Sequence, residues 1–265
     1  MDQKLQLAII SAVNAGREIL KIYNESILVE YKSDGSPLTQ ADKNAHLIIV
    51  EGLKASGLPV LSEEGKTIPY EYRSKWEQFW LVDPLDGTKE FIKKSGEFTV
   101  NIALIEHNTP IIGVVYVPVT GVLYYASSNI GSYKAQLDDN FSEKDIDTLI
   151  ERSLLLTDGV FPAIYTIVAS RLHPSKETDE FVSRKRAEVG DIDLISAGSS
   201  LKLCLVAERK AHVYPRLAPT MEWDTAAGHA VASYSDCKVY DYNTGNQLKY
   251  NKENMLNPWF VVAGQ

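Results

Sequence analysis

The chain has 265 residues, of which 45% are hydrophobic and 23% are charged. These fractions exclude a disordered or collagen-like chain and suit one large domain or two modest ones. The 35 acidic residues outnumber the 27 basic ones, and the resulting charge of −8 argues against nucleic-acid polymers, whose binding depends on lysine and arginine neutralising phosphates. Binding of small anionic ligands stays possible, because the local charge of a site can be opposite to the net charge of the chain.

The number of cysteines and the longest uncharged stretch indicate in which cellular compartment the protein is expected. Cys204 and Cys237 are too few for a disulfide framework and fit a reducing compartment. The first ten residues show no signal peptide. Residues 108–133 carry no charge, but Pro118, Thr120 and Gly121 interrupt them and Val, Ile and Tyr dominate, so two buried strands fit better than a membrane helix. We expect a cytoplasmic protein without an integral membrane segment; peripheral membrane association stays open.

The first half is predicted to begin with two helices. Apolar residues recur at helical spacing through residues 2–23. A turn-rich loop at residues 32–37 follows, and Thr39 and Asp42 have the spacing of a capping box that opens a second helix.

Five strands are predicted next. They are expected at residues 59–62, 79–82, 98–105, 111–117 and 122–127. The short connections between the last three favour an antiparallel meander. The polar segment 138–151 is the expected junction between an N-terminal α+β domain, residues 1–150, and a C-terminal α/β domain, residues 151–265.

The second half alternates strands with helices, as in α/β layering. Strands are expected at residues 165–169, 192–195, 212–214 and 238–240. Helices are expected at residues 177–188, 199–207 and 223–233.

Acidic residues recur directly after predicted strands or at the starts of predicted helices. They are Asp42, Glu63, Glu64, Asp83, Asp86 and Asp224. Each alone has an ordinary explanation as a turn residue, a helix cap or a solvated acid. Their repetition favours a shared site, where carboxylates would repel one another and a divalent metal would relieve the repulsion.

The segment Asp83-Pro-Leu-Asp-Gly-Thr88 carries the clearest chemical signal. Pro84 cannot continue a strand ladder, and Gly87 permits a sharp turn. A tight loop here can aim two carboxylates and the Leu85 carbonyl at one point, and such hard oxygen ligands suit Mg²⁺. If Thr88 starts a helix, the free N–H groups there can hold a phosphate. The residues therefore predict an oxygen-ligated metal site near a phosphate.

The same segments resemble the signatures of the inositol monophosphatase superfamily, Li⁺-sensitive and Mg²⁺-dependent phosphomonoesterases. Four segments match in order, at residues 36–42, 62–64, 80–91 and 223–231. Further segments resemble its CysQ-type 3′(2′),5′-bisphosphate nucleotidase branch, at residues 96–104, 113–118, 198–202 and 214–216. The resemblance covers most of the chain and departs at residues 136–150, which form an acidic segment.

The resemblance implies a fold and a cofactor. The fold is a layered αβαβα sandwich of mixed α+β and α/β character, with the active site between the two halves. The cofactor is Mg²⁺, two to three ions per site. One ion is expected on Glu63, Asp83 and the Leu85 carbonyl. A second is expected on Asp83, Asp86 and Asp224, and a weaker third lies near Glu63.

The resemblance also implies the catalytic residues. In the family's mechanism one ion lowers the pKa of a bound water, and the other stabilises the leaving oxygen. Thr88 and Asp42 orient that water for in-line attack, and Glu63 joins them as a catalytic residue through its metal. No covalent phosphoenzyme is expected, and Glu64 is expected to support the ligands.

Substrate contacts are implied on both halves. The cleaved phosphate is expected at the metals and at the amides of Gly87 and Thr88, and the second phosphate and ribose are expected at residues of the second half. The implied set is Glu63, Leu85, Asp86, Gly87, Thr88, His173, Ser199, Lys202, Arg216 and Asp224. The point charge of a lysine ammonium and the paired N–H groups of an arginine guanidinium are suited to binding a phosphate. The alternative interpretation of His173 is an ordinary loop residue. The alternative interpretation of Lys202 is a solvated helix residue.

The implied activity is hydrolysis of 3′-phosphoadenosine 5′-phosphate to AMP and phosphate, in nucleotide recycling and sulfur assimilation. One alternative is an inositol-1-phosphate or sugar phosphatase of the same fold. Another is a non-catalytic nucleotide-binding regulator, against which the intact acidic set argues. The expected partner is a small phosphorylated nucleotide. The sequence neither ranks this nucleotide against 3′-phosphoadenosine 5′-phosphosulfate nor specifies an oligomeric state.

Overall fold

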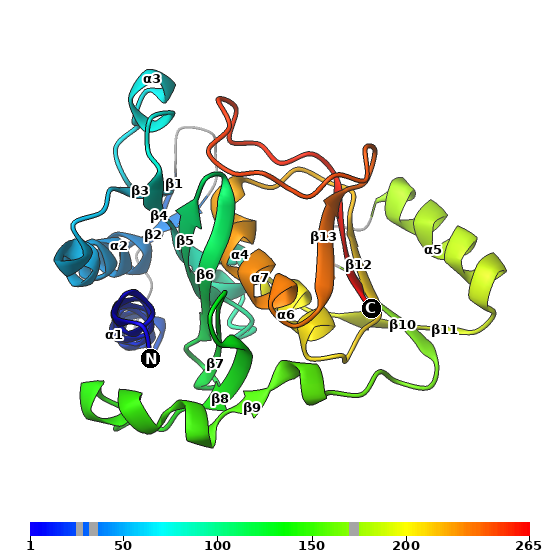
Figure 1. Cartoon of the computed structure of the whole chain (residues 1–265), viewed down its shortest axis with the longest axis horizontal. Helices are drawn as coiled ribbons and strands as arrows, with labels where there is room; N and C mark the ends of the chain where they lie inside the picture. Colours follow the sequence, from blue (N-terminus) through cyan, green and yellow to red (C-terminus); the bar gives the residue numbers. More distant parts are fainter. Residues whose placement is uncertain (25–28, 32–36, 170–174) are drawn as a thin grey trace.

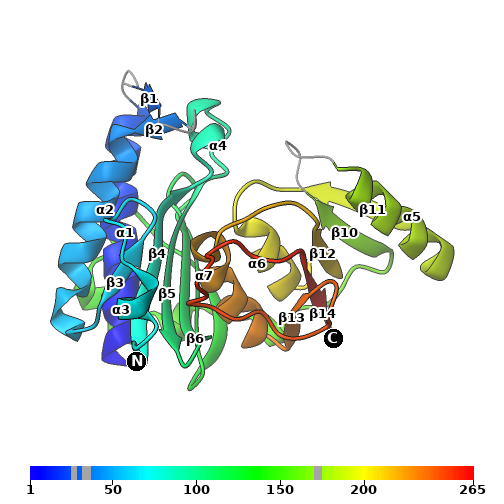
Figure 2. The same cartoon turned by 90° about the horizontal axis from the view of Figure 1, so that it is seen from above.

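Five layers stack in the order helices, sheet, helices, sheet, helix, as Figure 2 shows from above. The structure, a computed structural model, describes residues 1–24, 29–31, 37–169 and 175–265, and the side chains of all of these except 29–31 and 37–39. The layering confirms the αβαβα sandwich expected from the sequence.

The first sheet has seven strands, paired in chain order. They are β3 (Val60–Ser62), β4 (Gln78–Asp86), β5 (Thr99–Glu106), β6 (Thr109–Val117), β7 (Val122–Ser127), β8 (Gly131–Gln136) and β9 (Leu154–Leu155). β3 and β4 are parallel, and all later pairs are antiparallel. The predicted meander is confirmed, and the uncharged stretch 108–133 forms β6 and β7 with the turn between them. β8 was not predicted, because its sequence is polar.

Two helices cover one face of this sheet, as Figure 1 shows. They are α1 (Gln3–Asn24) and α2 (Gln40–Leu53). Their buried residues recur at helical spacing, for example Leu5, Ile9 and Ala12 in α1. Both predicted helices are confirmed. The described part of the chain contains no helix that is long and apolar enough to cross a bilayer.

The second sheet has five strands in the order β11-β10-β12-β14-β13. They are β10 (Tyr165–Ala169), β11 (Ile192–Ser196), β12 (Val213–Arg216), β13 (Cys237–Asp241) and β14 (Phe260–Gly264). β10 is parallel to both β11 and β12, as α/β layering predicts. β14, which was not predicted, pairs antiparallel with β12 and β13.

Helices α6 (Leu201–Ala207) and α7 (Glu222–Ser233) lie between the sheets, and α5 (Lys176–Val189) covers the outer face of the second sheet. α7 packs directly on β6. A Cβ atom added to Gly113 would lie 2.3 Å from the carbonyl oxygen of Ala227, so only glycine allows this approach. The contact brings the first turn of α7 beside the ends of β3 and β4.

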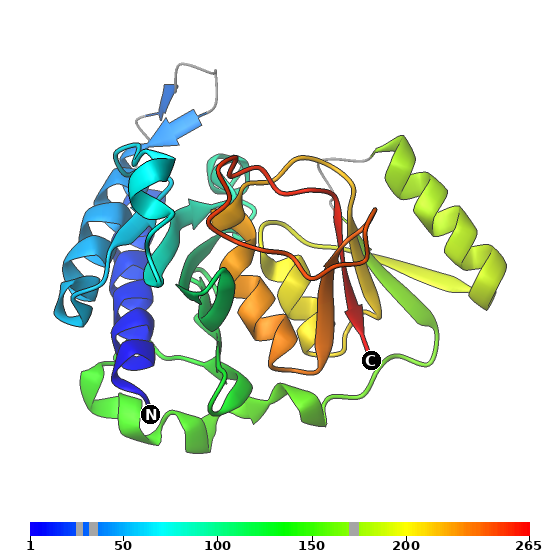
Figure 3. The same cartoon turned by 45° about the horizontal axis from the view of Figure 1, so that its top comes forward.

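The acidic segment after β8 is folded. It forms the 3₁₀ helices η2 (Glu143–Thr148) and η3 (Ile150–Arg152), and Phe141, Ile146 and Leu149 are buried in the core beneath α1 and α2. Figure 3 shows this green segment running beneath the helices toward the second sheet. The domain boundary at residue 150 stays a prediction.

Candidate active site

The two acids of the Asp83–Thr88 segment lie on strand β4, which continues to Asp86. The prediction that this strand ends at residue 82, directly before Asp83, is therefore wrong. Asp83 pairs with Asn101 and Asp86 pairs with Thr99, so three steps along β4 match two along β5. This β-bulge places both acids on one face, because their two partners also share a face. Proline is tolerated at a bulge, where no ladder hydrogen bond is needed.

Three carboxylates from three elements converge beside this bulge. Glu63 directly follows β3, and its N–H donates to the Val82 carbonyl at 3.1 Å. Asp224 lies in the first turn of α7. One carboxylate oxygen from each of Glu63, Asp83 and Asp224 lies within 4.8 Å of the others. Three hard oxygen donors at this spacing suit a divalent cation.

The electrostatics of Asp83 show that the cluster is larger than three acids. Burial raises the pKa of the Asp83 carboxyl well above its usual range, and the charges of Glu63, Asp86, Asp224 and Asp42 raise it further. Asp42 itself is buried in the first turn of α2. The structure therefore brings together five of the six acids that the sequence singled out, all except Glu64, and their repulsion favours a bound cation.

Local hydrogen bonds orient two of these carboxylates. Asp83 Oδ1 accepts the Leu85 N–H at 3.1 Å, and Asp224 Oδ2 accepts the Met221 N–H at 2.9 Å. Burial raises the pKa of Asp224, and the charge of Asp86 adds to the shift. Each acid is thus held by its own turn, although the surroundings disfavour its charge.

A short helix, α4 (Thr88–Ile92), begins beside the acids, which meets the condition set for a phosphate site at Thr88. Gly87 precedes it with φ 93°, a backbone conformation that favours glycine. The Gly87 carbonyl accepts the Phe91 N–H at 2.9 Å. The earlier N–H groups of the helix have no partner within it, which leaves them available to an oxyanion.

A polar network from the second half holds Asp86. The Ser199 hydroxyl donates to Asp86 Oδ2 at 2.5 Å, and the Ser200 N–H donates to the same oxygen at 2.7 Å. Behind them, Thr99 Oγ1 lies 2.6 Å from Ser199 Oγ, and the Ser200 hydroxyl donates to Asn101 Oδ1 at 2.8 Å. Ser199 therefore lies at the acidic cluster, with its hydroxyl bound to Asp86. Its contact with the second phosphate and ribose stays a prediction.

The sequence reading missed Thr99, Asn101 and Ser200. All three are buried. A usable signal was present, because Thr99 and Asn101 are polar residues two positions apart in an otherwise apolar strand. Such spacing places both side chains on one face.

Lys202 and Arg216 lie on the side of the cluster where Asp86 is found. Lys202 is only 4% exposed, and its ammonium donates to the carbonyls of Ala197 and Ser199. Burial lowers its pKa to about 8, opposed by the charge of Asp86. The alternative reading of Lys202 as a solvated residue is therefore wrong. Arg216 donates to the Pro219 carbonyl at 3.0 Å, and its buried Nε has no hydrogen-bond partner.

The remaining predicted substrate residue, His173, falls outside the described residues, as does Ser36 of the first matching segment. Their roles stay predictions.

Comparison with known proteins gives a match across the chain. Residues 1–261 match the model of the inositol monophosphatase family. The 3′(2′),5′-bisphosphate nucleotidase CysQ of Salmonella typhimurium is 45% identical, over 99% of this chain and 99% of that protein. The protein of the same name from Haemophilus influenzae is 33% identical, over 99% of this chain and 93% of its own length.

Solved structures agree. The crystal structure of CysQ from Bacteroides thetaiotaomicron, described as a bacterial member of the inositol monophosphatase family, superposes with a TM-score of 0.88 at 47% identity. The comparison covers 98% of this chain and 96% of that one. The extragenic suppressor protein suhB from Bartonella henselae, at 22% identity and a TM-score of 0.73, shares the fold.

Proposed function

Because this chain belongs to the inositol monophosphatase family, we propose that its acidic cluster is the centre of a metal-dependent phosphomonoesterase. The enzyme is a 3′(2′),5′-bisphosphate nucleotidase, which hydrolyses 3′-phosphoadenosine 5′-phosphate to AMP and phosphate. The observation that carries this function is the convergence of oxygens from Glu63, Asp83 and Asp224 within 4.8 Å. Full-length identity of 45% to a nucleotidase supports the substrate.

The donor set fits Mg²⁺. Its members are buried or half-buried carboxylates, and burial, together with their mutual repulsion, raises the pKa of Asp83 and Asp224. Glu63, Asp83 and the Leu85 carbonyl would hold one ion, and Asp83, Asp86 and Asp224 would hold another. Bound there, Mg²⁺ supplies charge stabilisation for the phosphoryl oxygens and lowers the pKa of a water molecule.

The attacking group is water rather than a side chain. The two cysteines, Cys204 and Cys237, are buried, and burial raises the pKa of both thiols, so neither supplies a thiolate. Asp42 and Thr88 hold the attacking water: Asp42 accepts its proton, and the Thr88 hydroxyl fixes its direction. The α4 N–H groups bind the oxygens of the cleaved phosphate.

The second phosphate lies on the other side of Asp86. Lys202 and Arg216 bind it, since each presents a cation at this edge of the cluster. The Lys202 ammonium has three N–H donors, and the carbonyls of Ala197 and Ser199 use two of them, so one remains for a phosphate oxygen. The unpartnered Nε of Arg216 is a donor that an anionic ligand would satisfy.

A competitive kinetic panel tests this function. It compares 3′-phosphoadenosine 5′-phosphate, 3′-phosphoadenosine 5′-phosphosulfate and inositol 1-phosphate with Mg²⁺, with and without Li⁺. We expect an adenosine nucleotide to have the highest kcat/KM. A higher kcat/KM for inositol 1-phosphate would overturn the substrate assignment but keep the enzyme class. Absence of any turnover would favour a nucleotide-binding regulator.

A further inference from the structure

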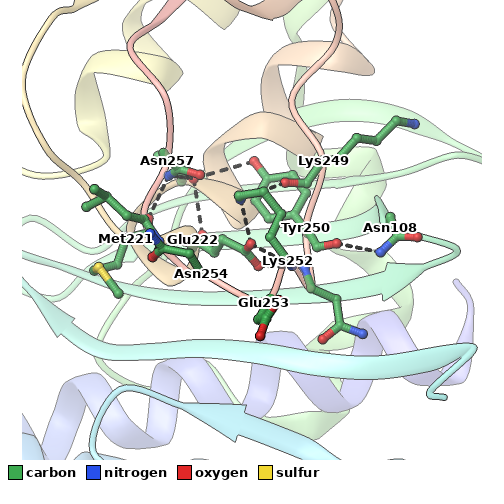
Figure 4. A network of polar contacts seen from close by, with 12 residues as sticks. Asn108, Met221, Glu222, Lys249, Tyr250, Lys252, Glu253, Asn254 and Asn257 are labelled. Carbon is green, nitrogen blue, oxygen red and sulfur yellow. Dashed lines mark hydrogen bonds and ion pairs between the residues drawn. The ribbon is translucent and has the colours of Figure 1, made fainter. Parts of the chain in front are cut away.

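The first turn of α7, which carries Asp224, lies against a segment close to the end of the chain, residues 249–257. Figure 4 shows the polar contacts that join the two. The Glu222 N–H donates to the Met255 carbonyl at 2.9 Å, and the Asn257 N–H donates to the Thr220 carbonyl at 2.8 Å. The two stretches therefore pair like short antiparallel strands directly before the helix.

A buried carboxylate strengthens this pairing. Glu222 is fully buried. Its Oε2 accepts the Asn251 N–H at 2.6 Å, and its Oε1 accepts both the Lys252 N–H at 3.0 Å and the Lys252 ammonium at 2.5 Å. Both oxygens thus face N–H donors of the same segment (Figure 4). Hydrogen bonds to a charged acceptor are stronger than neutral ones, so this is the firmest attachment of the segment to α7.

The pairing fixes the peptide group that orients Asp224. The Met221 N–H donates to Asp224 Oδ2 at 2.9 Å, and the Met221 carbonyl accepts from Asn257 Nδ2 at 2.8 Å. Met221 is thereby held between the acid and the segment. If the segment shifts, Met221 shifts with it, and the Asp224 carboxylate loses its fixed direction.

The same segment also reaches the first half of the chain. Arg73, in the connection between β3 and β4, donates to Asn251 Oδ1 at 2.8 Å, and Asn251 Nδ2 donates to the Arg73 carbonyl at 2.7 Å. Both residues are buried. This pair therefore attaches the segment to the connection between β3 and β4, whose strands carry or precede Glu63 and Asp83.

We propose that Glu222 is a positioning residue for the metal site. Its carboxylate holds residues 251–252 on the first turn of α7, and this holds the Asp224 oxygen near those of Glu63 and Asp83. The inference rests on the proposed metal-dependent function. Partners that orient metal ligands typically contribute about 10–100-fold to metal affinity.

The test is calorimetric titration of Mn²⁺ into metal-free wild-type and Glu222→Gln proteins. Glutamine is nearly the same shape, but in either orientation its NH₂ group meets an N–H donor of Asn251 or Lys252. We expect Glu222→Gln to weaken Mn²⁺ binding by about 10-fold or more. Wild-type affinity in this variant would overturn the inference.

Glu208→Gln is the matched control. Glu208 is also a buried carboxylate, 8% exposed, with a lysine partner, Lys134, at 2.5 Å. It follows α6 and has no hydrogen bond to residues 220–224 or 249–257 among the described contacts. Its variant should lose a comparable amount of thermal stability while keeping wild-type Mn²⁺ affinity. An equal loss of Mn²⁺ affinity would overturn the inference in favour of general destabilisation.

A second variant, Asn257→Ala, decides the matter if Glu222→Gln does not fold. It removes the Nδ2 contacts with the Met221 carbonyl and with the hydroxyls of Thr220 and Thr225, and it leaves the Glu222 carboxylate bonds intact. Weaker Mn²⁺ binding supports the inference, and unchanged binding overturns it. Wild-type protein that binds no Mn²⁺ would contradict the proposed function itself, an outcome distinct from failure of the variants.

Discussion

The Ser199 hydroxyl donates to Asp86 Oδ2 at 2.5 Å, although 113 positions separate the two residues along the chain. The bond joins the bulged end of β4 to the turn before α6. Together with the Ser200 N–H, it orients an acid of the first half by groups of the second. The acidic cluster is therefore complete only when both sheets and the helices between them have packed.

The first prediction concerns this bond. Ser199→Ala should lower kcat/KM for 3′-phosphoadenosine 5′-phosphate by about 10-fold, since a hydrogen bond to a charged group contributes about 1.5–3 kcal/mol. Steady-state phosphate release measures it. Ser200→Ala is the control, because its backbone N–H still donates to Asp86; we expect less than about a threefold change. An equal fall in both variants would contradict a specific role for the Ser199 hydroxyl.

The second prediction concerns Asp83, which lies between the other acids. Asp83→Asn should lower kcat/KM by about 10³-fold or more, because metal-ion stabilisation of the transition state amounts to several kcal/mol. In EDTA the same variant should unfold at the same or a higher temperature than wild type, since it removes a buried charge from a repulsive cluster. Substantial turnover by the variant, or a much lower melting temperature in EDTA, would refute the assignment.

The third prediction concerns the pH dependence of stability without metal. Asp83 and Asp224 have pKa values raised above the ordinary value of 3.8, so the folded state retains protons that the unfolded chain releases. Their stabilising contribution is complete below about pH 4 and is lost as the pH rises through the folded-state values. In EDTA, wild type should therefore lose more stability than Asp83→Asn as the pH rises above about 4.

Urea unfolding at fixed pH values measures this difference. Mg²⁺ should remove it, since a bound cation favours the charged carboxylates. Parallel pH profiles for wild type and variant in EDTA would show that burial and repulsion do not raise the pKa of Asp83.

The fourth prediction concerns Lys202, whose pKa is lowered from 10.5 to about 8 by burial. Its positive charge is present below pH 8 and is lost as the pH rises through that value. KM for the nucleotide should therefore rise above pH 8. Lys202→Met should raise KM at pH 7 by about 10-fold with a smaller effect on kcat, and should abolish the pH dependence.

Lys210→Met is the control for Lys202, because Lys210 lies on the surface beyond the same helix and its ammonium is 3.5 Å from Glu208. It should leave KM unchanged. A Lys202→Met enzyme with wild-type KM would remove this lysine from the substrate site.

Many residues of the site could be predicted from the sequence, because the patterns that indicate them span only a few neighbouring residues. Helical spacing in residues 2–23 predicted α1, and β-branched runs predicted β5 to β7. Acids placed directly after short apolar strands predicted the cluster of Glu63 and Asp83, because the ends of neighbouring strands meet at one edge of a sheet.

Other features depended on pairing between distant residues. The bulge that places Asp83 and Asp86 on one face arises from register with β5, and nothing in residues 83–86 alone specifies that register. The burial of Lys202 and of Glu222 likewise follows from packing against segments far away in the chain.

The sequence by itself determined which groups are available: the acids, the glycine at position 87 and the cations of the second half. Tertiary structure decided which of these meet and in what electrostatic setting. The reason is physical: residue type and short spacing follow from covalent order, whereas register, burial and carboxylate repulsion arise only when separate strands, such as β4 and β5, pair and exclude water.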